Sequence, residues 1–332
     1  METVLVTGAN GHVGYNIVQC LRKKNYNVKA GVRHSHITEK VKPLQELGAQ
    51  ICELDIMNPK TIEKAVDGVS GVFQVAAVYN AAPKNPQREI INPSIIGGIN
   101  VLKAAEKAKV KKVIFTSSIA AIVSKKNQRF FTEEDWNDTP ISSYAIAKTE
   151  AEKKAWKFAQ EKGINLITLC PSMIIGPGFH RHTASTFFFE QVLREKVPVI
   201  LPFSFTFVDV RDVAHAHILA YEKDHALGRY IVCNSYKTMD NLLKEIKELD
   251  STIKIPLTKL PKSMTRFLPL FDWLGHKFTK TPRMITKSTM KEFTGKEQRV
   301  SNDKIRQELG WEPTDFRDSL RDTLDWIRKY FM

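Results

Sequence analysis

The sequence predicts an α/β fold in which a doubly wound parallel sheet is accompanied by a smaller, mainly helical C-terminal lobe. Short apolar runs alternate with amphipathic stretches over the first 170 residues, and the runs VLV, VFQVA, VIF and LITL are continuous instead of alternating. Strands that are buried on both faces of a parallel sheet need such continuous runs. We therefore expect residues 1–175 to form the sheet domain, with later returns near 206–235, and residues 176–332 to form the second lobe.

Strands and helices are expected to alternate through the first domain, as right-handed crossovers between parallel strands require. The expected strands are Thr3–Thr7, Asn27–Val32, Gln50–Leu54, Gly71–Ala76, Lys112–Ser117 and Asn165–Cys170. The amphipathic helices between them are Val13–Lys24, Pro59–Val66, Pro93–Ala108 and Tyr144–Lys162. After Pro171 we expect helices near 183–196, 239–249 and 315–330, a strand–helix pair in FVDVRDVAHAHILAYEK, and a strand near 230–234.

The composition is that of an ordinary globular protein, with 42% apolar and 26% charged residues, and it argues against disorder, collagen-like repeats and a coiled-coil rod. The 50 basic residues exceed the 36 acidic ones, which we interpret as a basic solvated surface, although a polyanion, a membrane surface or an anionic cofactor are alternatives. The four cysteines include no CxxC pair and are expected to be reduced. Without a signal peptide or an 18-residue apolar run, a cytoplasmic protein with no integral membrane segment is expected.

A glycine-rich loop follows the first expected strand, in the run TGANGHVG at residues 7–14. Gly8 and Gly11 allow a tight turn whose backbone N–H groups face a ligand, and Gly14 lets the next helix pack close to the strand. The N-terminus of that helix then faces a pyrophosphate. An incidental glycine turn is the alternative, but a loop between a strand and an amphipathic helix favours a dinucleotide. The expected cofactor contacts here are Thr7, Gly8, Asn10, Gly11, His12, Val13 and Gly14.

The residues after the second and third strands bear on which dinucleotide binds. An acidic residue at the end of the second strand would hold the ribose 2′-hydroxyl of NAD, but here the strand ends KAGVR. The guanidinium of Arg33 suits a 2′-phosphate, so NADP(H) is favoured over NAD(H), with a surface arginine stacked on adenine as the alternative. Asp55, followed by Ile56, is placed to accept a hydrogen bond from the adenine amino group, or else to cap a helix.

Tyr144 and Lys148 stand four residues apart in SSYAIAKTEAEK, so a helix places them on one face. The ordinary pKa of tyrosine is about 10, and a nearby ammonium lowers it by stabilising the phenolate. The same lysine can hydrogen-bond a nicotinamide ribose. Ser118 follows the fifth strand, at the edge where parallel sheets bind ligands, and Ser117 is the competing serine. We interpret this set as a proton-handling group, and chance is a poor explanation for it beside the glycine loop.

These motifs together resemble the extended short-chain dehydrogenases/reductases along nearly the whole chain. TGANGHVG, TSS and YAIAK are similar to that family's cofactor loop and Ser-Tyr-Lys triad, CPSMIIGPG to its cofactor segment, VDVRDVAHAH to its second-lobe signature, and LGWEP to its closing motif. TSSIAA, FTEEDWND and AEKKAW resemble the dihydroflavonol reductase, cinnamoyl-CoA reductase and aldehyde/ketone reductase branch. The resemblance implies a Rossmann sheet and a nicotinamide cofactor.

The resemblance also implies roles for individual residues. Tyr144 would be the general acid, Lys148 its pKa tuner and ribose anchor, and Ser118 the group that orients the substrate carbonyl. The cofactor would further be contacted by Ala76, Ala77, Pro171, Ser172 and Met173. Residues 79–82 and the 256–300 stretch depart from the plant members, so their substrates are not transferred.

Several other features favour structural roles. The pairs His180-x-His182 and His215-x-His217 lack a carboxylate or cysteine at ligand spacing, so no metal is expected. Cys170 is interpreted as a buried, inert thiol. The apolar residues of 264–278 are expected to line a pocket or pack between lobes, with membrane contact as the alternative. The paired lysines accompany no nucleic-acid motif, so no nucleic acid is expected.

The expected function is the NADPH-dependent reduction of a carbonyl to an alcohol. Aromatic residues suggest an apolar or aromatic aldehyde or ketone as the substrate; they are Phe179, Phe187, Phe188, Phe189 and Trp273. The alternatives are a sugar-nucleotide epimerase or dehydratase, a 3β-hydroxysteroid-type dehydrogenase, and a non-catalytic NADP-sensing regulator. The oligomeric state stays open, with a homodimer as one option.

Overall fold

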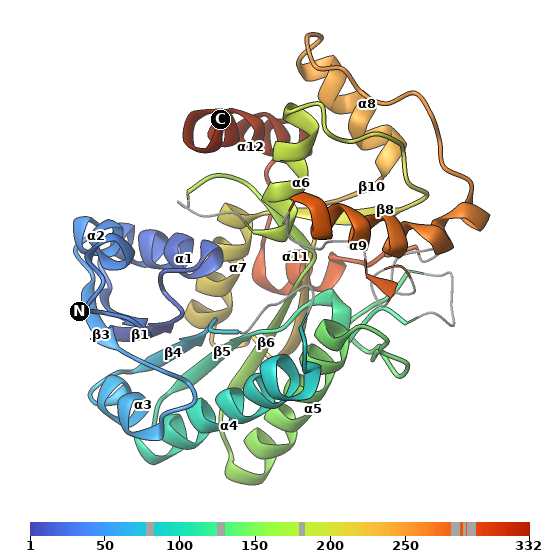
Figure 1. Cartoon of the computed structure of the whole chain (residues 1–332). Helices are drawn as coiled ribbons and strands as arrows, with labels where there is room; N and C mark the ends of the chain where they lie inside the picture. The colour runs from blue at the N-terminus through green and yellow to red at the C-terminus, as the bar shows by residue number, and fades with distance from the viewer. Residues whose placement is uncertain (78–82, 125–129, 179–182, 280–285, 288–289, 291–296) are drawn as a thin grey trace.

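A seven-stranded parallel sheet forms the centre of the larger part of the molecule, which we describe from a computed structural model (Figure 1). The structure describes residues 1–77, 83–124, 130–178, 183–279, 286–287, 290 and 297–332. The strands, in their order across the sheet, are β3 (Gln50–Glu53), β2 (Asn27–Val32), β1 (Thr3–Thr7), β4 (Gly71–Gln74), β5 (Lys112–Thr116), β6 (Leu166–Pro171) and β9 (Gly228–Val232). The strand order reverses between β1 and β4, which is where doubly wound sheets bind ligands. The expected fold class is confirmed.

Helices cover both faces of this sheet, as Figure 1 shows. One face carries α1 (His12–Lys23), α2 (Thr38–Glu46), α7 (Val210–Glu222) and α11 (Asp303–Leu309), and the other carries α3 (Pro59–Val66), α4 (Asn92–Lys107) and α5 (Ser143–Lys162). Val4 and Val6 of β1 point into the first core, and Leu5 between them points into the second. Burial on both sides is the reason that the strands read as continuous apolar runs.

The six strands and four helices expected over the first 170 residues all form, and their ends differ from the expected ones by at most two residues. Helix α2 was not expected, and it contains Pro43. The described chain also forms short helical turns at η1 (Gln87–Ile91), η2 (Ile119–Ala121) and η3 (Lys262–Phe267), and a further helix α9 (Leu268–Thr279).

The C-terminal lobe is mainly helical, as expected, and it also contains a second, three-stranded sheet. Its strands lie in the order β10 (Ser235–Thr238), β8 (Ser204–Asp209) and β7 (Met173–Ile175). The helices around it are α6 (Ala184–Leu193), α8 (Met239–Leu249) and α12 (Phe316–Phe331). Phe207 of β8 is buried in the core of this lobe. Of the returns expected near 206–235, β8 joins the small sheet, while α7 and β9 join the large one.

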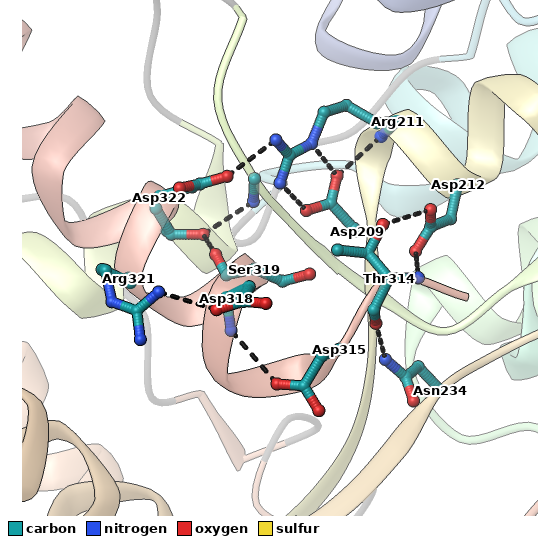
Figure 2. A network of polar contacts seen from close by, with 12 residues as sticks. Asp209, Arg211, Asp212, Asn234, Thr314, Asp315, Asp318, Ser319, Arg321 and Asp322 are labelled. Carbon is teal, nitrogen blue, oxygen red and sulfur yellow. Dashed lines mark hydrogen bonds and ion pairs between the residues drawn. The ribbon is translucent and has the colours of Figure 1, made fainter.

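The second-lobe signature and the closing motif bind each other in the fold. The indole of Trp311 donates a 2.9 Å hydrogen bond to the backbone oxygen of Asp212. The carboxylate of Asp212 accepts bonds of 2.8 Å from the backbone N–H and from the hydroxyl of Thr314 (Figure 2). The side chain of Asn234 donates a 2.7 Å bond to the carbonyl of Thr314. These two motifs therefore attach the C-terminal segment to the start of α7.

An ion-pair chain adds to this attachment (Figure 2). Arg211 lies 2.6 Å from the carboxylate of Asp209 and 2.7 Å from that of Asp322 on α12. Asp209 also caps α7, because its Oδ1 accepts a bond from the backbone N–H of Arg211. The C-terminal helix is thus fixed to the strand–helix junction that links the two sheets.

Among the described residues, no helix is both long and apolar enough to cross a bilayer. The four cysteines are free thiols, as expected, and Cys170 and Cys233 are buried.

Candidate active site

The glycine loop lies at the end of β1, beside the residue that follows β4. Gly8 has a φ of 62°, and a Cβ at this position would lie 2.9 Å from Cα of Ala76. A Cβ at Gly14 would lie 2.3 Å from the carbonyl oxygen of Gly8, which no real side chain tolerates. The first glycine therefore makes the tight turn and the third lets α1 approach the strand, as the sequence predicted.

The N-terminus of α1 fits an anionic group. Gly11 is the N-cap residue, and within the described part of the chain no side chain caps this helix. The first turn holds no acidic residue. The uncapped backbone N–H groups, including those of Val13 and Gly14, and the positive end of the helix dipole suit a pyrophosphate.

Thr7 forms hydrogen bonds with the residues at the end of β4. Its hydroxyl donates a 2.6 Å bond to the side-chain oxygen of Gln74 and accepts bonds of 3.0 Å from the N–H groups of Val75 and Ala76. These bonds join the ends of β1 and β4 at the point where the strand order reverses. The side chain of Thr7 therefore shapes the site, and Ala76 is held against the glycine turn.

The side chain of His12 is directed away from the expected pyrophosphate. Its Nε2 lies 3.1 Å from the carbonyl oxygen of Gly176, and its ring stacks on Trp326 with the ring centroids 6.0 Å apart. Burial lowers the pKa of His12 to about 4, so the imidazole is neutral at physiological pH. The ring of His12 thus links the glycine loop to the C-terminal helix.

Arg33 follows β2, and Asp55 lies two residues after the end of β3. Arg33 is exposed. One carboxylate oxygen of Asp55 accepts a 2.9 Å bond from the backbone N–H of Met57, so Asp55 stabilises the turn. The residue that caps α3 is Asn58, which removes the helix-cap alternative for Asp55. Ile56 is buried against Gly97 of α4.

The two candidate serines face different surroundings. Ser117 is buried, and its hydroxyl donates a 2.5 Å bond to the carboxylate of Glu152 inside the core. Ser118 is the N-cap of η2, and its Oγ accepts a 3.2 Å bond from the N–H of Ala120. That bond leaves the hydroxyl proton of Ser118 to donate to another acceptor. The geometry therefore favours Ser118 over Ser117 as a group that meets a ligand.

Tyr144 and Lys148 lie in the first two turns of α5, whose N-cap is Ser142. The ammonium of Lys148 donates a 3.0 Å bond to the carbonyl of Thr116, the last residue of β5. This bond and the packing of η2 against α5 bring the helix start and the strand end together. Burial lowers the pKa of Lys148 to about 8, while the charge of Glu152 opposes that shift.

Glu152 is a residue of this site that the sequence did not single out. It lies one turn beyond Lys148 on α5, is fully buried, and forms an ion pair with Arg229 of β9 at 2.8 Å. It also accepts hydrogen bonds from Ser117 and Thr168. The sequence pointed to Glu152 only through its spacing of four residues from Lys148. Its ion-pair partner Arg229 lies 77 positions from Glu152, so no local pattern connects the two.

The segment FTEEDWND is held against this ion pair. Arg229 donates bonds of 2.8 Å and 2.6 Å to the backbone oxygens of Glu133 and Asp135. Its guanidinium lies 3.7 Å from the ring centroid of Trp136, and the carboxylate of Glu133 accepts a bond from the N–H of Ile231. The segment that resembles the reductase branch is therefore attached to the helix of Tyr144 through one buried arginine.

The segment Pro171–Met173 joins β6 to β7. Its central residue, Ser172, is buried, and its hydroxyl has no hydrogen-bond partner among the described residues. A buried hydroxyl without a partner costs free energy unless a ligand satisfies it. The segment therefore holds a hydroxyl at the end of β6 for which the described residues supply no partner. Ala77, after β4, is exposed.

Two other expectations from the sequence concern histidines and aromatics. His217 is buried between the hydroxyl of Thr116 at 2.8 Å and the carbonyl of Val213 at 2.7 Å, so both ring nitrogens have partners. No group of three metal-ligating side chains occurs in the described residues. Phe189 is fully buried in the core of the C-terminal lobe, and Phe188 is partly buried and packs against the same core. Residues 79–82 and 179–182, with Phe179, His180 and His182, lie outside the described residues.

The comparison with known sequences places the chain among reductases. A family model described as the NAD dependent epimerase/dehydratase family matches residues 4–234. A cinnamoyl-CoA reductase (CAD2) of Medicago truncatula is 33% identical over 77% of this chain and 83% of its own length. A bifunctional dihydroflavonol 4-reductase/flavanone 4-reductase of Malus domestica is 32% identical over 77% of this chain and 78% of its own length. The expected family and branch are confirmed.

The comparison with solved structures agrees on the fold. The protein gox2253 has a TM-score of 0.86 at 27% identity and covers 100% of this chain and 99% of its own. A UDP-glucose 4-epimerase of Thermotoga maritima, solved with UDP-glucose, has a TM-score of 0.77 at 26% identity over 99% and 100% of the two chains. Gre2 of Candida albicans in complex with NADPH has a TM-score of 0.77 at 25% identity over 100% of both chains.

Proposed function

The chain belongs to the NAD dependent epimerase/dehydratase family, and we propose that it is an NADPH-dependent reductase of small carbonyl compounds. The observation that carries this proposal is the placement of Tyr144, Lys148 and Ser118 where β5 and α5 meet, at the same edge of the sheet as the glycine loop. A bound NADPH would supply the hydride. The protein's own residues would supply the proton and hold the substrate.

In this proposal, Tyr144 donates the proton to the substrate oxygen as the carbonyl becomes an alcohol. Lys148 is fixed to the carbonyl of Thr116 and cannot swing away from α5. Its ammonium stabilises the phenolate that the transfer leaves behind, because an adjacent positive charge favours the ionised form of tyrosine. The pKa of Lys148, lowered to about 8 by burial, keeps most of this group protonated at pH 7.

Ser118 orients the carbonyl by donating its hydroxyl proton to the substrate oxygen. The bond that its Oγ accepts from Ala120 fixes the side chain without using that proton. Ser172 contributes a second hydroxyl that is ready to bond the cofactor's amide. The hydroxyl of Ser118 is held before the substrate arrives, so little reorganisation of this group is needed on binding.

The preference for NADPH rests on Arg33, an exposed arginine directly after β2 where an acidic residue would favour NAD. It is further supported by the NADPH complex of the similar Gre2 structure. The relatives named cinnamoyl-CoA reductase and dihydroflavonol 4-reductase support an apolar or aromatic aldehyde or ketone as the substrate class.

Replacing Tyr144 with Phe tests the proton donor. The variant keeps the ring and loses only the hydroxyl, so we expect kcat to fall by about 100-fold or more while the affinity for NADPH stays unchanged. Steady-state turnover and a fluorescence titration with NADPH measure the two quantities. Full turnover by Tyr144→Phe would show that another group donates the proton.

A further inference from the structure

An apolar surface lies exposed on the C-terminal lobe, along η3 and α9. Its large apolar side chains are Leu257, Met264, Phe267, Leu270, Phe271, Trp273 and Phe278. Phe271 is 63% exposed and Phe278 is 80% exposed, values that a packed globular helix does not show for phenylalanine. We call these seven residues the apolar patch.

The patch follows from the way α9 is oriented. Phe267, Leu270, Phe271 and Phe278 recur at the three- and four-residue spacing of one helical stripe, yet all four are exposed. The residue that α9 buries instead is Pro269, and Thr265 of η3 is also buried. Among the described elements, α9, labelled in Figure 1, packs mainly against η3. The apolar stripe of this helix therefore faces outward.

Cations surround the apolar patch. Between Lys254 and Phe278 the sequence holds five lysines and arginines and one acidic residue, Asp272. Lys254 and Lys259 form ion pairs with Glu195 and Asp240, so the cations assigned to the patch are Lys262, Arg266 and Lys277. Arg266 lies with its guanidinium 4.8 Å from the ring centroid of Phe267, and Lys277 lies with its ammonium 5.6 Å from that of Trp273. Long basic side chains that cover aromatic rings and end in charge are typical of helices at a membrane interface.

We propose that the apolar patch and its cations form a docking surface for an anionic phospholipid membrane, with α9 lying in the plane of the interface. The aromatic and aliphatic side chains would enter the boundary between headgroups and acyl chains. Lys262, Arg266 and Lys277 would contact the lipid phosphates. The patch includes none of Tyr144, Lys148 and Ser118, although it includes Trp273, which we had expected to favour an aromatic substrate.

Charge favours a membrane over a second copy of the chain. A dimer built on this patch would bring Lys262, Arg266 and Lys277 of one protomer against the same three cations of the other, on a protein whose net charge is +14. An anionic bilayer supplies the opposite charge along with an apolar interior, and each lysine or arginine near such a surface strengthens binding about fivefold. The membrane therefore satisfies both features of the patch.

The test is co-sedimentation of the full-length protein with vesicles of phosphatidylcholine alone and with vesicles containing phosphatidylserine. We expect binding to the anionic vesicles that is at least about tenfold tighter than to the neutral ones and that weakens with added salt. The readout needs no turnover, so it is independent of the proposed reaction.

Matched variants test the surface itself. Phe271→Ser with Phe278→Ser should abolish binding, whereas Leu227→Ser, which replaces a 70% exposed leucine outside the patch, should leave it unchanged. Lys262→Gln with Lys277→Gln should weaken binding about 30-fold, and the equally charged control Lys60→Gln with Lys64→Gln should not.

Three outcomes would overturn the proposal. They are failure of the unaltered protein to sediment with anionic vesicles, equal sedimentation of the patch variants, and a dimer in solution that the patch variants separate into monomers. The last outcome would assign the patch to a second copy of the chain.

Discussion

At the scale of single residues, the site depends on the balance of charge around Lys148. Burial disfavours its ammonium and lowers its pKa to about 8, and the carboxylate of Glu152 one turn away acts in the opposite direction. Glu152 in turn is held by Arg229 of β9 and by the hydroxyl of Ser117. Ser117, the alternative to Ser118 in the sequence, thus hydrogen-bonds the carboxylate that favours the charged form of Lys148.

Replacing Glu152 with Gln should change the pH dependence of turnover. Without the carboxylate the pKa of Lys148 falls further below 8, so the ammonium is lost at a lower pH. We expect the alkaline limb of the kcat/KM profile to move to lower pH, as measured on the protein that remains folded by circular dichroism. Breaking a buried ion pair costs about 3–5 kcal/mol, so the variant will also melt earlier.

The control is Glu150→Gln on the same helix, which should leave the profile in place. A purely structural role for Glu152 would lower the melting temperature and leave the alkaline limb unmoved, and that result would contradict this assignment.

The buried histidines His12 and His217 should make the stability of the protein depend on pH. Burial lowers the pKa values of His12 and His217 to about 4, whereas an unfolded histidine titrates at about 6.5. As the pH falls from 6.5 to 4, the two histidines become protonated in the unfolded state while they stay neutral in the folded state. The free energy of unfolding that the protein has above pH 6.5 therefore decreases. Urea denaturation at pH 7 and pH 5 should show a loss of about 2 kcal/mol from each histidine.

His217→Gln should remove the contribution of His217 to this pH dependence, even if the substitution also changes the stability at pH 7. The surface residue His225 provides the control, because His225→Gln should retain the full pH dependence. An unchanged difference between the two pH values in His217→Gln would refute the account of this buried histidine.

At the scale of elements, the helices and strands with strong periodicity could be predicted from the sequence, and the short ones could not. The strands β7 and β10 have three and four residues, and their pairing with β8 joins segments that are about 30 residues apart or more. β10 is also largely polar, SYKT, so no apolar pattern marks it. Whether such short strands form depends on their pairing with a distant strand, and a local sequence pattern does not reveal that pairing.

The close contact between α1 and the end of β1 can be tested by replacing Gly14. Gly14→Ala would place a Cβ 2.3 Å from the carbonyl oxygen of Gly8, so α1 must shift away from the loop. We expect NADPH affinity to fall by about tenfold or more and the melting temperature to drop. Isothermal titration and thermal denaturation measure the two effects.

Gly275→Ala in α9 is the matched control, because a Cβ there meets nothing within 4 Å. Replacing this partly buried helical glycine with alanine should stabilise α9 slightly and leave NADPH binding unchanged. Unaltered NADPH affinity in Gly14→Ala would contradict the role of this close approach in shaping the phosphate loop.

At the scale of the whole molecule, the two sheets are joined by contacts between residues far apart in sequence. Trp311 bonds to Asp212, and Trp326 stacks on His12 of the glycine loop. The sequence motifs identified the glycine loop, Tyr144 and Lys148 because their chemistry needs fixed residue types at short spacing. They did not reveal the partners supplied by distant segments, which is why the orientation of His12 and the role of Arg229 were missed.

We propose that the assembled molecule reduces carbonyl compounds with NADPH. The most direct measurement is the consumption of NADPH and of NADH, followed by nicotinamide absorbance, against a panel of aromatic aldehydes, α-diketones and flavanone-type ketones. We predict NADPH consumption with at least one member, a weaker reaction with NADH, and an increase in the KM for NADPH of about tenfold or more in Arg33→Ala. Tightly retained NAD with no net consumption of NADPH on any member would contradict the claim and indicate an epimerase that recycles its cofactor.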